Sequence, residues 1–183
     1  CWLMVPPDGE PVAIDASGAA GSLASMAAYR DLTHIPHRGP RAALTVAGTV
    51  SGWDEALKVS QEMTGKALPL SRLLADAIGY AQDGTPVTLS QATATADKVA
   101  ELRDITGFAD TYLHNGLPPT AGTRFRQLAL AATQKRLVEE GLDSIYRSPS
   151  AECSAHGMGQ YGLLVTLTEL QQHRPRRTTA LRS

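Results

Sequence analysis

Apolar and polar positions follow a helical period through most of this chain. Apolar side chains recur three or four positions apart, which places them on one stripe of a helix. Glycine or proline follows several of these stretches, as expected where a helix stops. The pattern predicts helices over residues 23–30, 50–64, 71–81, 90–103, 127–140 and 150–158, and a short helix between Thr166 and Pro175.

The two ends of the chain carry strand patterns instead. Apolar runs at 1–5 and 12–14 flank a proline-rich turn with Asp-Gly at its tip, which predicts a β-hairpin. A last strand is predicted at 178–181, and the segment 31–45 is predicted to be irregular. Because an isolated hairpin is only marginally stable, we expect it to pair with strands that lie outside this chain.

Local signals refine the helix ends. Ser90 is the expected N-cap of its helix, and Gly65 and Gly141 are the expected C-terminal stops. Thr166 with Glu169 three positions later matches a capping box. Trp53, on the apolar stripe of residues 50–64, is expected to pack in the core.

The chain is long enough for one ordinary domain, and its composition is that of a globular protein. The chain is 43% hydrophobic and 19% charged, close to globular averages. A formal net charge of −1 lacks the basic excess of a nucleic-acid binder. The basic run 174–177 is read as a solvated tail or strand end. No apolar run is long enough to cross a bilayer, so neither nucleic acid nor a membrane is an expected partner.

Cysteine and histidine give little reason to expect a metal or a disulfide framework. Cys1 and Cys153 are the two cysteines; packed free thiols are the default expectation, and a single bridge between them is the alternative. His34 and His37 have a metal-pair spacing but no supporting carboxylate or thiol cluster, so hydrogen-bonded or solvated histidines are expected. No metal and no cofactor are implied. The chain opens without methionine inside a strand-like run, which suggests a segment trimmed at both ends.

Six segments stand out along the chain: residues 12–15, 48–53, 68–84, 116–133, 140–147 and 162–170. In that order they resemble the large subunit of the γ-glutamyltranspeptidase family of N-terminal nucleophile hydrolases, which implies that residues 1–183 are a single segment of that subunit. The likeness covers nearly the whole chain, and its center is a glycine-bracketed turn into a helix that carries Trp53. Glycines there let the backbone turn tightly and let the helix pack closely.

The resemblance implies a fold, a mechanism and a partner. The implied class is α+β: this fragment, mostly helical with edge strands, forms part of a four-layer αββα sandwich. Such a proenzyme cleaves itself, and the new N-terminal threonine uses its own α-amino group as general base. That threonine would sit on a separate small subunit from the same precursor. Thr178 and Thr179 are read as strand residues, so no catalytic residue is assigned to this chain.

Ser17 departs from the family pattern. Enzymes acting on γ-glutamyl compounds have an arginine at this place, which clamps the substrate carboxylate with two hydrogen bonds. Here Ser17 and Gly18 offer a hydroxyl and backbone N–H groups, which could form an anion-binding nest. Ser17 as a plain turn residue is the alternative. Arg38 or Arg41 from the irregular segment could replace the missing guanidinium.

The substrate implied is therefore a small carboxylate amide rather than a γ-glutamyl compound. The pattern is similar to a divergent bacterial branch that includes oxamate amidohydrolases and cephalosporin acylases. A γ-glutamyltransferase or glutathione hydrolase is the first alternative, and a non-catalytic helical binding module is the second. The resemblance is also compatible with a dimer of heterodimers, and the cytoplasm is favoured over the periplasm.

Overall fold

The computed structural model describes residues 1–6, 9–42 and 44–180. The chain divides into two compact units, Cys1–Leu68 with Glu140 onward, and Pro69–Glu139. The expectation that residues 1–183 are a single segment of a large subunit stays a prediction. None of the helices in the described ranges is both long and apolar enough to cross a membrane.

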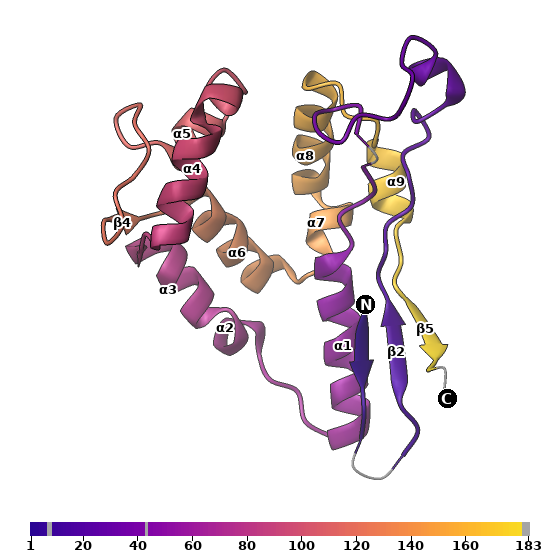
Figure 1. The fold of residues 1–183 in the computed structure, drawn as a ribbon. Helices are drawn as coiled ribbons and strands as arrows, with labels where there is room; N and C mark the ends of the chain where they lie inside the picture. Colours follow the sequence, from indigo (N-terminus) through magenta and orange to yellow (C-terminus); the bar gives the residue numbers. More distant parts are fainter. Residues whose placement is uncertain (7–8, 43, 181–183) are drawn as a thin grey trace. The chain divides into compact units, whose positions relative to one another are not determined.

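The first unit combines a small antiparallel sheet with helices (Figure 1). Its sheet has the order β1-β2-β5, and α1 packs against β1 and β2. Its elements are β1 (Trp2–Met4), β2 (Val12–Asp15), the 3₁₀ helix η1 (Met26–Tyr29), α1 (Thr49–Thr64), α7 (Ser144–Arg147), α8 (Pro149–Gln160), α9 (Leu167–Gln172) and β5 (Arg176–Thr179).

The second unit is mostly helical. Its two short strands pair in antiparallel register, Thr85 opposite Phe125, and the Gln127 N–H donates to the Ala81 carbonyl at 2.9 Å. Its elements are α2 (Leu70–Leu73), α3 (Ala75–Asp83), β3 (Thr85–Pro86), α4 (Leu89–Leu102), α5 (Phe108–Tyr112), β4 (Arg124–Phe125) and α6 (Leu128–Glu140).

A buried cluster of the first unit joins segments far apart in the sequence. Tyr146, on α7, is 1% exposed and packs with Val46 before α1, Val165 between α8 and α9, and Leu170 on α9. Burial of such apolar surface is the main driving force for folding. The cluster consists of Val46, Tyr146, Val165 and Leu170, with Val50, Ile145, Ala155 and Met158 packed around it.

Several local predictions are confirmed. The hairpin forms as β1 and β2, although part of its predicted turn, residues 7–8, lies outside the described residues. α1 ends at Gly65 in the left-handed conformation, with φ of 67°. Thr166 and Glu169 form the predicted capping box of α9. Thr178 and Thr179 are strand residues of β5.

The expectation that the hairpin pairs outside this chain is wrong. β2 pairs with β5 of the same chain, with Val12 opposite Thr179 and Asp15 opposite Arg176. The predicted strand 178–181 starts two residues earlier, at Arg176. Strand pairing over such a separation depends on tertiary packing, which a local pattern does not encode.

Other corrections concern helix bounds and exposure. The helix predicted over 71–81 is interrupted at Leu74, whose φ and ψ are −96° and −3°. Thr88, not Ser90, caps α4, because its hydroxyl accepts the Gln91 N–H at 3.1 Å. The helix predicted over 23–30 is the shorter 3₁₀ helix η1. The short elements α5, α7, β3 and β4 were not predicted.

Trp53 is 40% exposed rather than packed in the core. The indole that packs on α1 belongs to Trp2, since a Cβ built on Gly52 would lie 1.9 Å from its ring. Cys1 and Cys153 are free thiols as predicted, but both are exposed rather than packed.

Candidate functional site

The loop that follows β2 lies close against the segment that precedes α1. The Val46 N–H donates to the Ala19 carbonyl at 3.0 Å, and Ala20 forms a β-bridge with Thr45. A Cβ built on Gly18 would lie 1.9 Å from the Val46 carbonyl oxygen, far inside van der Waals contact. Only glycine therefore permits this approach of the two backbones.

Asp15, the last residue of β2, holds the loop that follows β2 through hydrogen bonds. Its Oδ1 accepts the Ser17 N–H at 2.9 Å, and its Oδ2 accepts Arg176 Nη2 at 2.9 Å. The Ser17 N–H, then the Ser17 hydroxyl, then Arg176 lower the pKa of Asp15 to about 2. The carboxylate is therefore charged at neutral pH and orients both the loop and the arginine.

An open hollow of about 550 Å³ lies beside this loop. Arg174 and Arg176 bring positive charge to its wall, and Glu169 brings negative charge. The Glu169 carboxylate already accepts the backbone N–H groups of Ser22 at 3.1 Å and Thr166 at 2.7 Å. The lining residues are Ser17, Gly18, Ala19, Val46, Glu169, Gln172, His173, Arg174 and Arg176.

A second hollow shares part of this wall. It measures about 450 Å³, and Ser17 and Gly18 line it together with Gly48 and Thr49. A Cβ on Gly48 would lie 1.8 Å from the Ala16 carbonyl oxygen, so this wall also depends on close backbone approach. Ser17 and Gly18 thus line both hollows.

A buried network of hydrogen bonds holds the segment before α1 that lines the hollows. The Ser51 hydroxyl donates to the Gly48 carbonyl at 2.7 Å and lies 2.7 Å from His173 Nε2. Because the hydroxyl proton goes to Gly48, His173 must donate from Nε2, which assigns its tautomer. The Tyr146 hydroxyl donates to the Ala47 carbonyl at 2.7 Å and accepts the Ser51 N–H at 3.1 Å.

The charge state of His173 follows from its position. Its side chain belongs to a residue only 7% exposed, its ring lies 5.3 Å from the Tyr146 ring, and Arg147 donates to its carbonyl. Burial lowers the pKa of His173 below its ordinary value of 6.5, so the neutral imidazole is favoured.

This burial predicts a pH dependence of stability. The unfolded chain binds the His173 proton more readily than the folded chain, so the stabilisation is complete above pH 6.5 and is lost as pH falls through the lower, folded pKa. We expect the melting temperature of the full-length protein to fall between pH 7 and pH 5. His173→Gln keeps an N–H donor without titrating, so its melting temperature should fall less over the same range. Equal slopes for the two proteins would contradict this assignment.

The predicted substrate-binding residues separate into two groups. Ser17 and Gly18 line both hollows, whereas Arg38 and Arg41 line neither. Arg41 instead pairs with Asp31 through two N–H groups at 2.6 and 3.0 Å, and its guanidinium lies over the Tyr29 ring at 5.8 Å. Arg41 thus braces its own irregular segment, and a role in substrate binding stays a prediction for both arginines.

Sequence reasoning missed the arginines that do line the hollow. Arg174 and Arg176 belong to the basic run that was read as a solvated tail or strand end. Two residues of this run form ion pairs within the fold: Arg176 pairs with Asp15, and Arg177 pairs with Glu55 and Glu62 on α1. The two-residue period of a strand could have indicated that neighbouring arginines face opposite ways.

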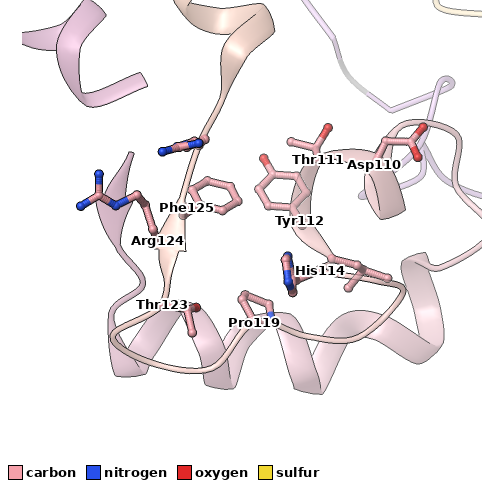
Figure 2. Close-up of a pocket in the computed structure, with 10 residues that line it drawn as sticks. Asp110, Thr111, Tyr112, His114, Pro119, Thr123, Arg124 and Phe125 are labelled. Carbon is pink, nitrogen blue, oxygen red and sulfur yellow. The ribbon is translucent and has the colours of Figure 1, made fainter. Parts of the chain in front are cut away.

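A separate hollow of about 550 Å³ lies in the second unit (Figure 2). The rings of Tyr112 and Phe125 line it with centroids 6.2 Å apart and planes within 15°, and His114 lies beside them. Arg124 donates to the Asp83 carbonyl at 3.0 Å. None of the predicted site residues lines this hollow.

The described part of the chain holds no group of three or more His, Cys, Asp or Glu side chains placed to bind a metal ion. His34 and His37 lie with ring centroids 6.1 Å apart, and the Thr33 hydroxyl lies 3.1 Å from His34 Nδ1.

The chain belongs to the γ-glutamyltranspeptidase family, whose model matches residues 2–183. It is 62% identical over 176 residues to the oxamate amidohydrolase proenzyme of Klebsiella pneumoniae, which covers 96% of this chain and 33% of that protein. It is 35% identical to the glutathione hydrolase proenzyme of Pseudomonas aeruginosa, over 92% of this chain and 29% of that protein. The γ-glutamyltranspeptidase structure of Pseudomonas nitroreducens matches with a TM-score of 0.78 and 31% identity, over 97% of this chain and 52% of that one.

The chain therefore spans about a third of the length of the curated relatives it matches. Membership in this family sets aside the alternative that the chain merely has a similar helix pattern. The α+β class, helix-rich with a few short strands, agrees with these relatives.

Proposed function

We propose that this chain is part of the large subunit of a self-processing amidohydrolase that cleaves the amide of a small carboxylate compound such as oxamate. The observation that carries the proposal is the 62% identity to an oxamate amidohydrolase proenzyme over 96% of this chain. The reaction adds water across the amide bond of oxamate and releases oxalate and ammonia. The departure at Ser17 supports a substrate other than a γ-glutamyl compound.

The nucleophile in this proposal is the N-terminal threonine of a small subunit cut from the same precursor. Its α-amino group takes the proton of its own hydroxyl, and the hydroxyl oxygen attacks the amide carbon. This chain contributes the substrate-binding wall around Ser17 and Gly18. Thr178 and Thr179 are given no part in this chemistry; both are strand residues of β5, opposite Ala13 and Val12 of β2.

Segments outside this chain would also cover the open face of the sheet. α1 covers one face of the β1-β2-β5 sheet, whereas Leu3, on β1, is 62% exposed. A four-layer αββα sandwich would bury such a side chain against a second sheet. We infer that the second sheet comes largely from segments outside this chain.

A γ-glutamyltransferase or glutathione hydrolase is the second candidate, and the 35% identity to a glutathione hydrolase proenzyme favours it. Such an enzyme must bind the larger γ-glutamyl group and, for transfer, an acceptor amine. Ser17 weighs against it, because a hydroxyl does not supply the fixed two-pronged donor that an α-carboxylate accepts.

Intact-mass spectrometry of the full-length protein at neutral pH tests the proposal first. We expect two fragments, the smaller beginning with threonine, and ammonia release from oxamate that far exceeds release of aniline from a γ-glutamyl anilide. Alanine in place of that threonine should leave one uncleaved, inactive chain. An uncleaved wild-type chain would contradict the mechanism, and a preference for the γ-glutamyl anilide would favour the second candidate.

A further inference from the structure

Arg176 lies directly opposite Asp15 in the register of β2 and β5, although the two residues are 161 positions apart. Directly opposed residues share one face of a sheet. Their neighbours, Ile14 and Arg177, are opposed in the same way on the other face. Ile14 is fully buried there, and Arg177 reaches Glu55 and Glu62 of α1. Arg176 therefore lies on the same sheet face as Leu3, opposite the face that α1 covers, at the Asp15 end of the strands where it borders the hollow.

Asp15 takes up only part of the hydrogen-bonding capacity of the Arg176 guanidinium. Its side chain is 76% exposed, and one nitrogen, Nη2, binds Asp15 at 2.9 Å. A guanidinium carries five N–H donors in a planar fork, so a single carboxylate oxygen occupies a minor share of them.

The other nearby arginines are engaged differently. Arg174 donates through Nη1 to the carbonyls of Gln171 and His173, both at 2.7 Å, where it closes the end of α9. Arg177 binds both oxygens of Glu62 and one oxygen of Glu55. Of the two arginines that line the hollow, Arg176 is the one anchored on the carboxylate that also orients the Ser17 N–H.

The negative groups near the hollow are already compensated. The hydroxyls of Ser22 and Thr166, and after them the backbone N–H groups of both residues, lower the pKa of Glu169 to about 2, so its charge is satisfied within the fold. Asp15 is satisfied by Ser17 and Arg176. An incoming carboxylate would therefore meet the free side of Arg176 beside the Ser17–Gly18 backbone.

We propose that Arg176, positioned by Asp15, binds the carboxylate of the substrate and determines the preference for a small anionic amide. The inference rests on the function proposed above. A planar guanidinium and a carboxylate form paired, charge-assisted hydrogen bonds with defined geometry. In oxamate the carboxylate is bonded directly to the amide carbon, so the cation that holds the carboxylate also places the reacting carbon.

The test compares oxamate with oxamide, its neutral diamide, as substrates of the full-length, self-processed enzyme. We expect Arg176→Gln to raise KM for oxamate about 10- to 100-fold, the range for losing hydrogen bonds to a charged group. The change in kcat should be much smaller, and the rate with oxamide should be unchanged. Arg176→Lys keeps the charge without the fork, and we expect it to raise KM about 10-fold.

Arg177→Gln is the matched control, because its side chain lies next in β5 but on the opposite face, away from the hollow. It should leave KM for both compounds unchanged. If Arg176→Gln fails to self-cleave, Arg176→Lys decides, and an unchanged KM for oxamate in the processed variant overturns the inference. A wild-type enzyme without activity on oxamate contradicts the proposed function itself. An active wild type with an unaltered Arg176→Gln variant contradicts the role of Arg176 alone.

Discussion

Replacing Tyr146 with alanine should destabilise the folded protein by about 3–5 kcal/mol, the usual cost of truncating a buried aromatic residue. Tyr146 is 1% exposed and packs with Val46, Val165 and Leu170, so the change opens a cavity in the main core of the first unit. It also removes the hydroxyl that joins the Ala47 carbonyl to the Ser51 N–H. Chemical denaturation of the full-length protein measures the free energy of unfolding.

Two further variants separate packing from hydrogen bonding. Tyr146→Phe keeps the ring but leaves the Ala47 carbonyl and the Ser51 N–H without their partner, at an expected cost of about 1–3 kcal/mol. Tyr161, which is 53% exposed, is the matched control, and its replacement with alanine should stay within about 0.5 kcal/mol. Similar losses for the alanine variants of both tyrosines would contradict the placement of Tyr146 at the core.

Replacing Gly18 with alanine should lower kcat/KM for oxamate about 100-fold, the cost of misplacing a binding group by roughly 1 Å. The new Cβ would lie 1.9 Å from the Val46 carbonyl oxygen, whereas ordinary contact begins near 3.4 Å. The loop that follows β2 and the segment that precedes α1 must therefore move apart. Both segments carry residues that line the hollow. The same strain should cost about 1–3 kcal/mol of stability.

Gly157→Ala is the control for this substitution. Gly157 lies within α8, and a Cβ there meets no atom within 4 Å. Alanine at a helical position should raise stability by about 0.5–1 kcal/mol and leave kcat/KM unchanged. A Gly18→Ala enzyme with normal activity and stability would show that the two backbones do not approach as closely as described.

Elements with strong local signals were predictable. The stop of α1 at Gly65 needs only a residue that tolerates positive φ, and the start of α9 needs only the Thr166 and Glu169 side chains. Both signals act within one helical turn, so they can be read from neighbouring residues. The break at Leu74 carries no such signal, because the apolar stripe continues through it.

The loop residues of the candidate site were predictable, but its arginines were not. Ser17 and Gly18 are predictable because they directly follow the family segment 12–15, and both line the hollows. Arg38 and Arg41 were proposed because they are basic and lie in an irregular segment, but Arg41 is paired with Asp31 and neither lines the hollows. Charge and loop position alone do not reveal which cation reaches a given anion site.

The sequence by itself determined the family, because six segments in a fixed order carry it. It also determined the helical period and the local caps, because these depend on residues near one another along the chain. Only the tertiary structure decided that β5 pairs with β2, and so places Arg176 beside Asp15 and the Ser17–Gly18 loop. Pairing of distant strands depends on burial of one sheet face against α1, a property of the whole unit. A shift of one residue in that register would exchange the directions of Arg176 and Arg177, so packing sets which arginine faces the hollow.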